Sequence, residues 1–183
     1  NKNILMKTKT LIILTAVVLS SCLKLDNNFY NKKAISSYQL DAYTGDQDFV
    51  LDQSYTIPAS NLNLFTLPSQ MKSEKSPVNI YALYIGDISR IATDTVILYC
   101  HGNKWHMDFY WQRAKLLAHV NGKNHYGVMM MDYRGYGASE GEPSEEGMYT
   151  DVDACMAWLK SKGLNSERLI IYALAWVRLQ LPN

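Results

Sequence analysis

Two glycine-containing loops carry the residues of this sequence that could do chemistry. The first begins with residues 101–103 (HGN), and the second spans residues 132–137 (DYRGYG). Imidazole and carboxylate groups serve in general acid–base catalysis, and glycine lets the backbone approach a substrate without a Cβ atom in the way. Each loop follows an apolar run, so the pattern predicts a site at the carboxyl ends of two buried strands.

The elements around these loops form a predicted βαβ unit. The apolar runs Val96–Cys100 and Tyr126–Met131 are expected to be strands, and Asp108–Val120 between them is expected to be a helix with Asp108 as its candidate N-cap. A second helix is expected from the N-cap Ser144 to Lys162, just before Gly163. Further strands are expected at residues 49–51, 62–67, 78–85 and 168–172.

Strands that alternate with helices predict an α/β fold with a mostly parallel sheet. The chain has 183 residues, of which 48% are hydrophobic and 19% charged, as in an ordinary globular domain. Its formal charge of +1 includes Lys2, Lys7 and Lys9 near the start, so the remainder is slightly acidic and gives no reason to expect nucleic acid as a partner. The run Met129-Met130-Met131 is interpreted as a core strand rather than as a metal or cofactor surface.

The first residues resemble a bacterial targeting segment. Lysines precede a short apolar stretch, and Leu19-Ser20-Ser21-Cys22 follows it as in a lipoprotein signal. We therefore expect residues 1–21 to be a signal peptide, Cys22 to be lipidated, and the protein to be anchored in a membrane of the bacterial cell envelope. A plain secretory signal with an incidental cysteine is the alternative. Polar residues 22–44 are expected to form a tether, with one amphipathic turn around residues 34–38.

Beyond Cys22, the chain has only Cys100 and Cys155. Two cysteines in an exported domain could form a disulfide. Cys100 ends an apolar strand, however, and Cys155 lies on the apolar side of a helix, which favours two buried free thiols. Neither spacing indicates a metal site, and no metal or cofactor is expected.

The order of these motifs is similar to that of the α/β-hydrolase superfamily. The features are a strand ending in His-Gly-Asn, a helix, a strand ending in Asp-Tyr-Arg-Gly-Tyr-Gly, and Pro-Ser-Glu before the next helix. The nearest branch resembles serine hydrolases of the α/β-hydrolase-domain or serine-aminopeptidase-like type. The resemblance covers about residues 78–172 and implies that residues 45–183 hold the N-terminal part of such a domain.

The resemblance implies a role for each loop. Gly102 and Asn103 belong to the loop that supplies a backbone N–H to the oxyanion hole. His101 is expected to fix this loop rather than to transfer protons, because the triad histidine of this fold follows the nucleophile in the chain. Asp132 and Arg134 are expected to brace the turn that contains Gly135 and Gly137. Trp105 and His106 are expected near the pocket mouth, either lining it or exposed on the loop.

The nucleophile elbow of the family, Gly-x-Ser-x-Gly, is absent from the sequence. The residues that follow Tyr172 are Ala-Leu-Ala-Trp-Val, which GCT TTA GCT TGG GTN can encode. With one G restored in front, the same bases read GGC TTT AGC TTG GGT, or Gly-Phe-Ser-Leu-Gly. We therefore expect a one-base deletion after the Tyr172 codon, with the serine at the position of Ala175; a natural alternative C-terminus is the other explanation.

Two functions follow from these expectations. The first is a lipid-anchored serine hydrolase that acts on a small-molecule or peptide acyl substrate, represented here by a frameshifted chain that is inactive because it lacks the nucleophile, the acid and the base. The second is a non-catalytic lipoprotein that binds a ligand or partner on the same scaffold. A nucleotide-binding Rossmann domain is disfavoured, because neither loop has the G-x-G-x-x-G spacing at a helix start.

Overall fold

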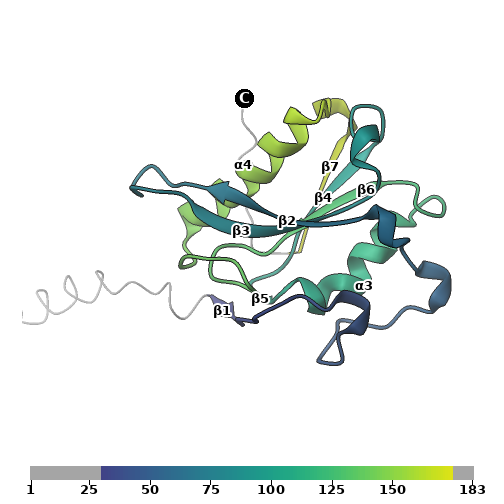
Figure 1. Ribbon diagram of the computed structural model, residues 1–183, viewed down its shortest axis with the longest axis horizontal. Coiled ribbons are helices and arrows are strands. Elements are labelled where there is room, and N and C mark those ends of the chain that lie inside the picture. Colours follow the sequence, from purple (N-terminus) through teal and green to yellow (C-terminus); the bar gives the residue numbers. More distant parts are fainter. Residues whose placement is uncertain (1–29, 175–183) are drawn as a thin grey trace, which may run out of the picture.

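The apolar runs of the sequence form the central strands of one sheet. The structure is a computed structural model that describes residues 30–174. Strands β4 (Val96–Cys100) and β6 (Gly127–Met131) are buried along their whole length. They have the predicted positions, and Figure 1 shows them between helix α4 (Glu145–Ser161) on one side of the sheet and helix α3 (Met107–Ala118) on the other.

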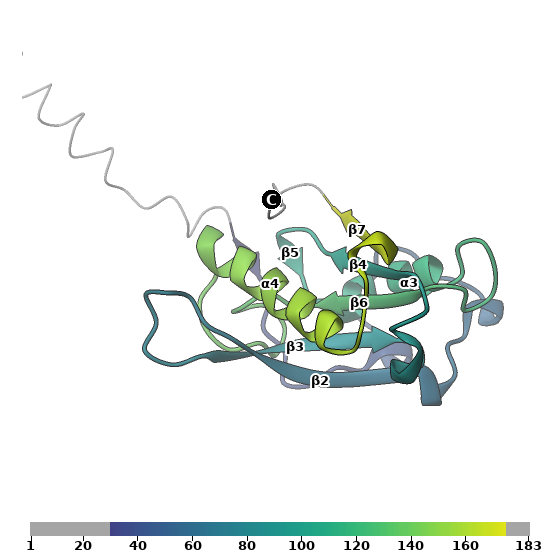
Figure 2. The ribbon, with the colours of Figure 1, turned by 90° about the horizontal axis from the view of Figure 1, so that it is seen from above.

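Within residues 30–174, the sheet contains five strands in the order β2 (Leu62–Ser69), β3 (Val78–Ile85), β6, β4 and β7 (Leu169–Ala173). Strands β2 and β3 pair in antiparallel fashion, and β3 pairs antiparallel with β6. Strand β4 pairs in parallel with β6 on one side and with β7 on the other. The prediction of a mostly parallel α/β sheet is therefore confirmed, with β2 and β7 at the two edges of the described sheet (Figure 2).

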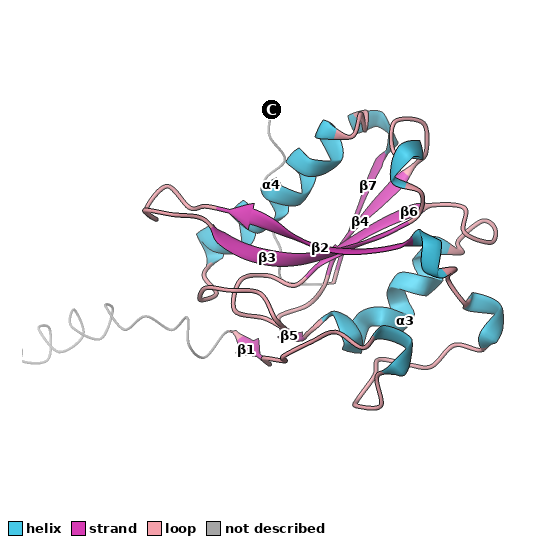
Figure 3. Ribbon diagram, viewed as in Figure 1, coloured by secondary structure: helices cyan, strands magenta, loops and turns pink. Residues whose placement is uncertain are grey.

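Alternate residues of the central strands point to opposite faces of the sheet, which divides the core into two layers. Figure 3 shows the helices that cover the two faces, α4 on one and α3 on the other. Leu98, Cys100, Met129 and Met131 pack toward α4. Their neighbours Ile97, Tyr99, Val128 and Met130 pack toward α3. The methionine run is thus a core strand, as predicted.

Helix α4 begins and ends as its sequence indicates. The Ser144 hydroxyl accepts a hydrogen bond from the Gly147 N–H at 3.0 Å, which makes Ser144 the N-cap. At the other end, Lys162 is the C-cap, and Gly163 follows with a φ of +90° that favours glycine.

Two predicted elements are wrong in detail. Helix α3 begins at Met107 with His106 as its N-cap, because the carboxylate of Asp108 bonds to a distant segment instead of capping the helix. Residues 49–51 form no strand. The Leu51 N–H donates to the side chain of Gln112 at 3.2 Å, so this stretch is held by α3 and has no strand partner.

The described part of the predicted tether packs against the domain. Strand β1 (Asn31–Lys32) pairs in parallel with β5 (Lys104–Trp105), and the two lie side by side in Figure 1. Ala34 forms a bridge with Gly137 rather than an amphipathic turn. Single turns of 3-10 helix complete the described chain: η1 (Leu40–Ala42), η2 (Gln53–Tyr55), η3 (Ala59–Asn61), η4 (Ile88–Arg90) and η5 (Ser166–Arg168).

The predicted signal peptide, Cys22 and the first part of the tether lie outside the described residues. Within residues 30–174, no helix combines the length and the apolar character that crossing a membrane requires.

Candidate active site

The two loops singled out in the sequence meet at one edge of the sheet, because β4 and β6 are parallel neighbours. His101 follows β4 and Asp132 follows β6, and neither side chain is exposed. The His101 Nε2 lies 3.0 Å from Asp132 Oδ1. The structure therefore joins the two loops through a buried imidazole–carboxylate contact.

The ring of His101 is held on several sides. Its Nδ1 lies 2.6 Å from the carbonyl oxygen of Gly102, and because a carbonyl oxygen only accepts, Nδ1 is the donor. The ring stacks on Tyr110 with centroids 5.2 Å apart, and Tyr133 lies 4.8 Å away at a tilt. These contacts are those of a side chain that fixes the loop from within.

Asp132 accepts hydrogen bonds through Oδ2 and through its backbone carbonyl oxygen. Its Oδ2 accepts from the Tyr38 hydroxyl at 2.7 Å, and its carbonyl oxygen accepts from the Ser139 hydroxyl at 2.7 Å. Burial, reinforced by the charge of Asp132, raises the pKa of Tyr38 far above its usual value, so the phenol remains a donor. Gly137 has a φ of +55°, and a Cβ atom there would lie 1.9 Å from Asp132 Oδ2. The close approach of carboxylate and turn therefore requires glycine.

Arg134 braces the second loop through helix α4. Its Nη2 donates to Asp151 Oδ1 and to the Ser69 hydroxyl, each at 2.9 Å, and its Nη1 donates to Glu74 at 2.9 Å. Burial alone would lower the pKa of the guanidinium, but the bonds and charges of Asp151 and Glu74 outweigh it and raise that pKa. Gly135 completes the turn with a φ of +76°. These contacts tie the turn to α4 and to the strand β2, through partners that the sequence had not identified.

The sequence contained a pattern from which the buried role of Asp151 could have been predicted. It lies among Met148, Val152 and Cys155, which form the buried face of α4, and it is itself fully buried. An acidic residue at an apolar position of a helix indicates a buried partner, since isolated buried charges are strongly unfavourable.

The predicted oxyanion loop lies beside the end of β7. Gly102 is tightly packed, since a Cβ atom there would lie 3.3 Å from the Tyr110 hydroxyl. The carbonyl oxygen of Asn103 accepts from the Tyr136 hydroxyl at 2.9 Å and from the Asn31 N–H at 3.1 Å. Leu174, directly after β7, donates its N–H to the Cys100 carbonyl at 3.0 Å. Ala175, the position expected for the nucleophile, lies outside the described residues.

Trp105 and His106 have different environments. The Trp105 ring stacks on Phe109 with centroids 5.1 Å apart, and the ammonium of Lys33 lies 4.2 Å from its centre. His106 is fully buried and edge-on to Tyr43, so it neither lines an open mouth nor lies exposed on the loop. Burial lowers the pKa of His106, and the nearby charges of Asp132 and Asp108 only partly offset this.

Cys100 and Cys155 are free and buried, as predicted. Burial raises the pKa of the Cys100 thiol to about 11. A thiol with that pKa is a poor nucleophile at neutral pH. The residues that the structure describes contain no group of three or more histidine, cysteine or acidic side chains arranged to hold a metal ion.

No family model matches this chain. The uncharacterized protein YfhR of Salmonella typhi is 33% identical over 76 residues, which are 41% of this chain and 25% of that protein. The alpha/beta hydrolase domain-containing protein 17B of Xenopus laevis is 32% identical over 77 residues, 42% of this chain and 26% of that protein. Among solved structures, the Pyrococcus furiosus esterase Pf2001 superimposes with a TM-score of 0.52 at 14% identity.

The esterase superposition covers 79% of this chain and 46% of the esterase. The resemblance inferred from the sequence is thereby confirmed at the level of the fold, which is that of the α/β hydrolases. The chain matches about a quarter of the length of its curated relatives and less than half of the esterase, as expected for an N-terminal part.

Proposed function

We propose that this chain, with its α/β-hydrolase fold, belongs to a serine hydrolase that cleaves an ester, thioester or peptide bond through an acyl-enzyme. The supporting observation is the hydrogen bond of 3.0 Å from the Leu174 N–H to the Cys100 carbonyl. Through it the chain leaves β7 beside the loop that begins at His101. A serine one residue later is proposed to act beside that loop, whose backbone N–H would help to stabilise the oxyanion of the tetrahedral intermediate.

In the proposed reaction, the serine hydroxyl attacks the acyl carbonyl, a histidine base takes its proton, and an acid orients that histidine. The oxyanion lies between the loop at Gly102 and Asn103 and the N–H that follows the serine. His101 is not this base, because its ring is stacked on Tyr110 and committed to the Gly102 carbonyl. The reaction requires no cofactor.

The reading frame after Tyr172 is part of the proposal. Ala175 has no hydroxyl group and cannot form an acyl-enzyme. The neighbouring frame of the same codons permits Gly-Phe-Ser-Leu-Gly, an elbow at the place where the strand-to-helix turn of this fold is expected. The chain as written is therefore proposed to be inactive, and the protein from the restored frame to be active.

We also propose, from the sequence, that a lipid on Cys22 anchors the protein to a membrane. Cleavage before Cys22 and lipidation of that cysteine would leave eight residues, 22–29, between the membrane surface and Tyr30. Because an extended chain spans at most about 3.5 Å per residue, these residues reach roughly 30 Å. The site loops, on which residues from Asn31 onward pack, would then stay near the membrane of the cell envelope.

The proposal is tested by sequencing the codons for residues 172–183 and by expressing both frames. The restored-frame protein is expected to react with a fluorophosphonate probe and to hydrolyse a short-chain p-nitrophenyl ester, whereas the chain as written does neither. Codons that do not spell the elbow in the neighbouring frame, or probe labelling of the chain as written, would contradict it. A restored frame without an elbow would favour the non-catalytic binding lipoprotein.

A further inference from the structure

An N-terminal segment, residues 30–43, crosses both loops of the candidate site and is here termed the strap. Asn31 donates its N–H to the Asn103 carbonyl at 3.1 Å, on the first loop. On the second loop, Gly137 donates its N–H to the Lys33 carbonyl and accepts from the Ile35 N–H, each at 3.0 Å. The strap is therefore bonded through its backbone to a residue of each loop.

The side chain of Tyr38 makes the contact closest to the chemistry. Its hydroxyl donates to Asp132 Oδ2 at 2.7 Å and accepts from the Ala138 N–H at 3.1 Å. Asp132 contacts His101, and His101 donates to the carbonyl of Gly102. A series of close polar contacts thus runs from Tyr38 of the strap through Asp132 and His101 to Gly102 in the predicted oxyanion loop.

The strap is also fastened to α3, the helix that follows the oxyanion loop. The carboxylate of Asp108 accepts from the Gln39 N–H at 3.1 Å and from the Leu40 N–H at 2.8 Å. Asp41 accepts from the indole N–H of Trp111 at 2.8 Å and from the ammonium of Lys115 at 2.6 Å. Leu40 keeps a φ of +50°, which is unfavourable for leucine and persists only where surrounding contacts impose it.

We propose that the strap positions the oxyanion loop and that Tyr38 is its positioning residue. The catalytic meaning of this inference rests on the proposed hydrolase function, because that function gives the loop at Gly102 and Asn103 its role. An oxyanion hole acts through donors that are fixed before the reaction. In this chain the strap fixes the oxyanion loop. Its Tyr38 binds the carboxylate of Asp132, which lies 94 residues later in the sequence.

The structural half of the proposal can be tested on the chain as written, by hydrogen–deuterium exchange. Tyr38→Phe removes only the hydroxyl and leaves Asp132 Oδ2 buried without that donor. We expect amides of residues 101–106 and 135–139 to exchange about tenfold faster or more, while amides of α4 keep their rates. Unchanged loop rates, or an equal increase in α4, would overturn the proposal.

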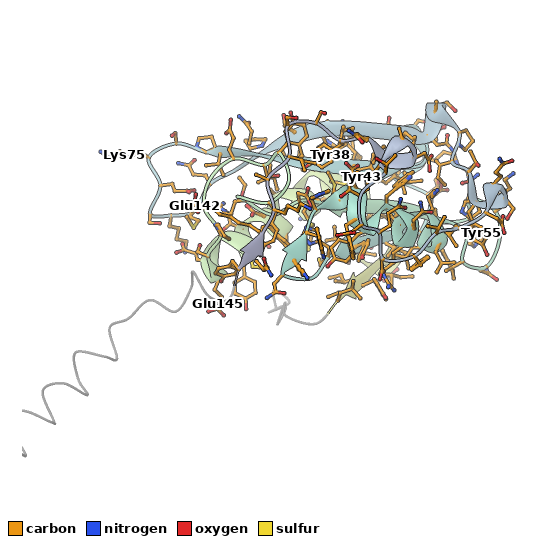
Figure 4. The ribbon with its side chains drawn as sticks, turned by 90° about the horizontal axis from the view of Figure 1, so that it is seen from below. Tyr38, Tyr43, Tyr55, Lys75, Glu142 and Glu145 are labelled. Atoms are coloured by element: carbon orange, nitrogen blue, oxygen red, sulfur yellow. The ribbon has the colours of Figure 1, made fainter. Side chains whose placement is uncertain are left out.

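Tyr43→Phe is the matched control. Tyr43 lies on the same strap and is labelled near Tyr38 in Figure 4, and its ring packs edge-on against His106 at 5.4 Å. Among the described residues, its hydroxyl bonds to neither site loop, so loop exchange is expected to stay unchanged. Should Tyr38→Phe fail to fold, Asp132→Asn replaces it. A neutral side chain at this position weakens the hydrogen bond from Tyr38 and also the contact with His101, so the same local pattern must appear.

The catalytic half is tested in the restored-frame protein. Tyr38→Phe is expected to lower kcat about tenfold or more while KM stays within about twofold, because the loss falls on the transition state. A kcat unchanged despite faster loop exchange would overturn the positioning role. If the restored-frame protein shows no hydrolase activity at all, the proposed function fails, and the exchange experiment still decides whether the strap fixes the loop.

Discussion

Arg134 and Asp151 form a buried ion pair that fastens the loop after β6 to helix α4. The Nη2 and Oδ1 atoms are 2.9 Å apart, and neither side chain is exposed. Asp151 Oδ2 also accepts from the Arg134 backbone N–H at 2.8 Å. One carboxylate therefore fixes both the side chain and the backbone of the residue at the centre of the glycine turn.

Asp151→Ala is expected to destabilise the fold by about 3–5 kcal/mol, because it leaves the guanidinium buried with a reduced set of partners. Urea denaturation measures this change in the free energy of unfolding. Asp153→Ala is the control, since Asp153 lies on the same helix and is exposed. We expect its effect to stay within about 0.5 kcal/mol. Similar losses for both variants would mean that the buried pair is unimportant.

The sequence predicted the elements whose signals are local. The apolar runs that became β4 and β6 and the cap at Ser144 are defined by neighbouring residues, so periodicity and capping rules located them. The same rules failed at Asp108. Its position suited an N-cap, but its carboxylate bonds to Leu40, 68 residues earlier in the chain. A contact between such distant residues leaves no periodic trace.

The candidate site was predictable to a similar extent. The motifs led to the expectation that His101, Asp132 and Arg134 fix the loops, because His101 and Asp132 each follow a predicted strand directly and Arg134 lies in the glycine turn. They did not identify Tyr38, which lies in a polar stretch that resembles a linker by composition. Its role depends on the strap folding back over two loops, and that placement is visible only in three dimensions.

Gly137→Ala is expected to destabilise the protein by about 3 kcal/mol, because a left-handed φ and a clash with Asp132 act together. The control is Gly122→Ala. Gly122 also has a positive φ, but a Cβ atom there would meet nothing closer than 3.8 Å, so about 1 kcal/mol is expected. Thermal denaturation of the two variants compares them. Equal effects would show that backbone conformation alone accounts for the loss.

Stability is expected to fall as the pH drops below about 6.5, the ordinary pKa of histidine, because of His106. Burial lowers the pKa of His106 in the folded state, so over this range the unfolded chain binds the proton more readily. The loss approaches about 1.4 kcal/mol per pH unit until the folded pKa is reached. Asp108 acts in the opposite sense at lower pH, because burial raises its pKa above the ordinary value of an aspartate.

His106→Phe tests this dependence through urea midpoints between about pH 7.5 and 5.5, which bracket the ordinary histidine pKa. The variant is expected to have a flatter profile and also to be more stable at neutral pH, because neither ring nitrogen of His106 has a hydrogen-bond partner among the described residues. His125→Phe, at an exposed histidine, should leave the slope unchanged. If the dependence of stability on pH keeps the same slope in His106→Phe, another titratable group causes it.

Cys100 and Cys155 are expected to resist iodoacetamide in the native protein, because both are buried and burial raises the pKa of each thiol. Peptide mass spectrometry after native labelling should find both unmodified, and labelling in urea should modify both. Native modification of Cys100 would show that the core beneath the candidate site opens readily.

The edge of β7 is expected to limit solubility of the chain as written. Strand β7 pairs only with β4 among the described strands, and Ile170 is 44% exposed on it. An apolar edge strand with unpaired backbone groups promotes association between chains. Ile170→Lys should therefore raise the soluble fraction. Val50→Lys is the control, because Val50 is 76% exposed but lies outside any strand. Since the added charge is the same, a larger gain for Ile170→Lys assigns the association to the strand edge, whereas equal gains would assign it to net charge.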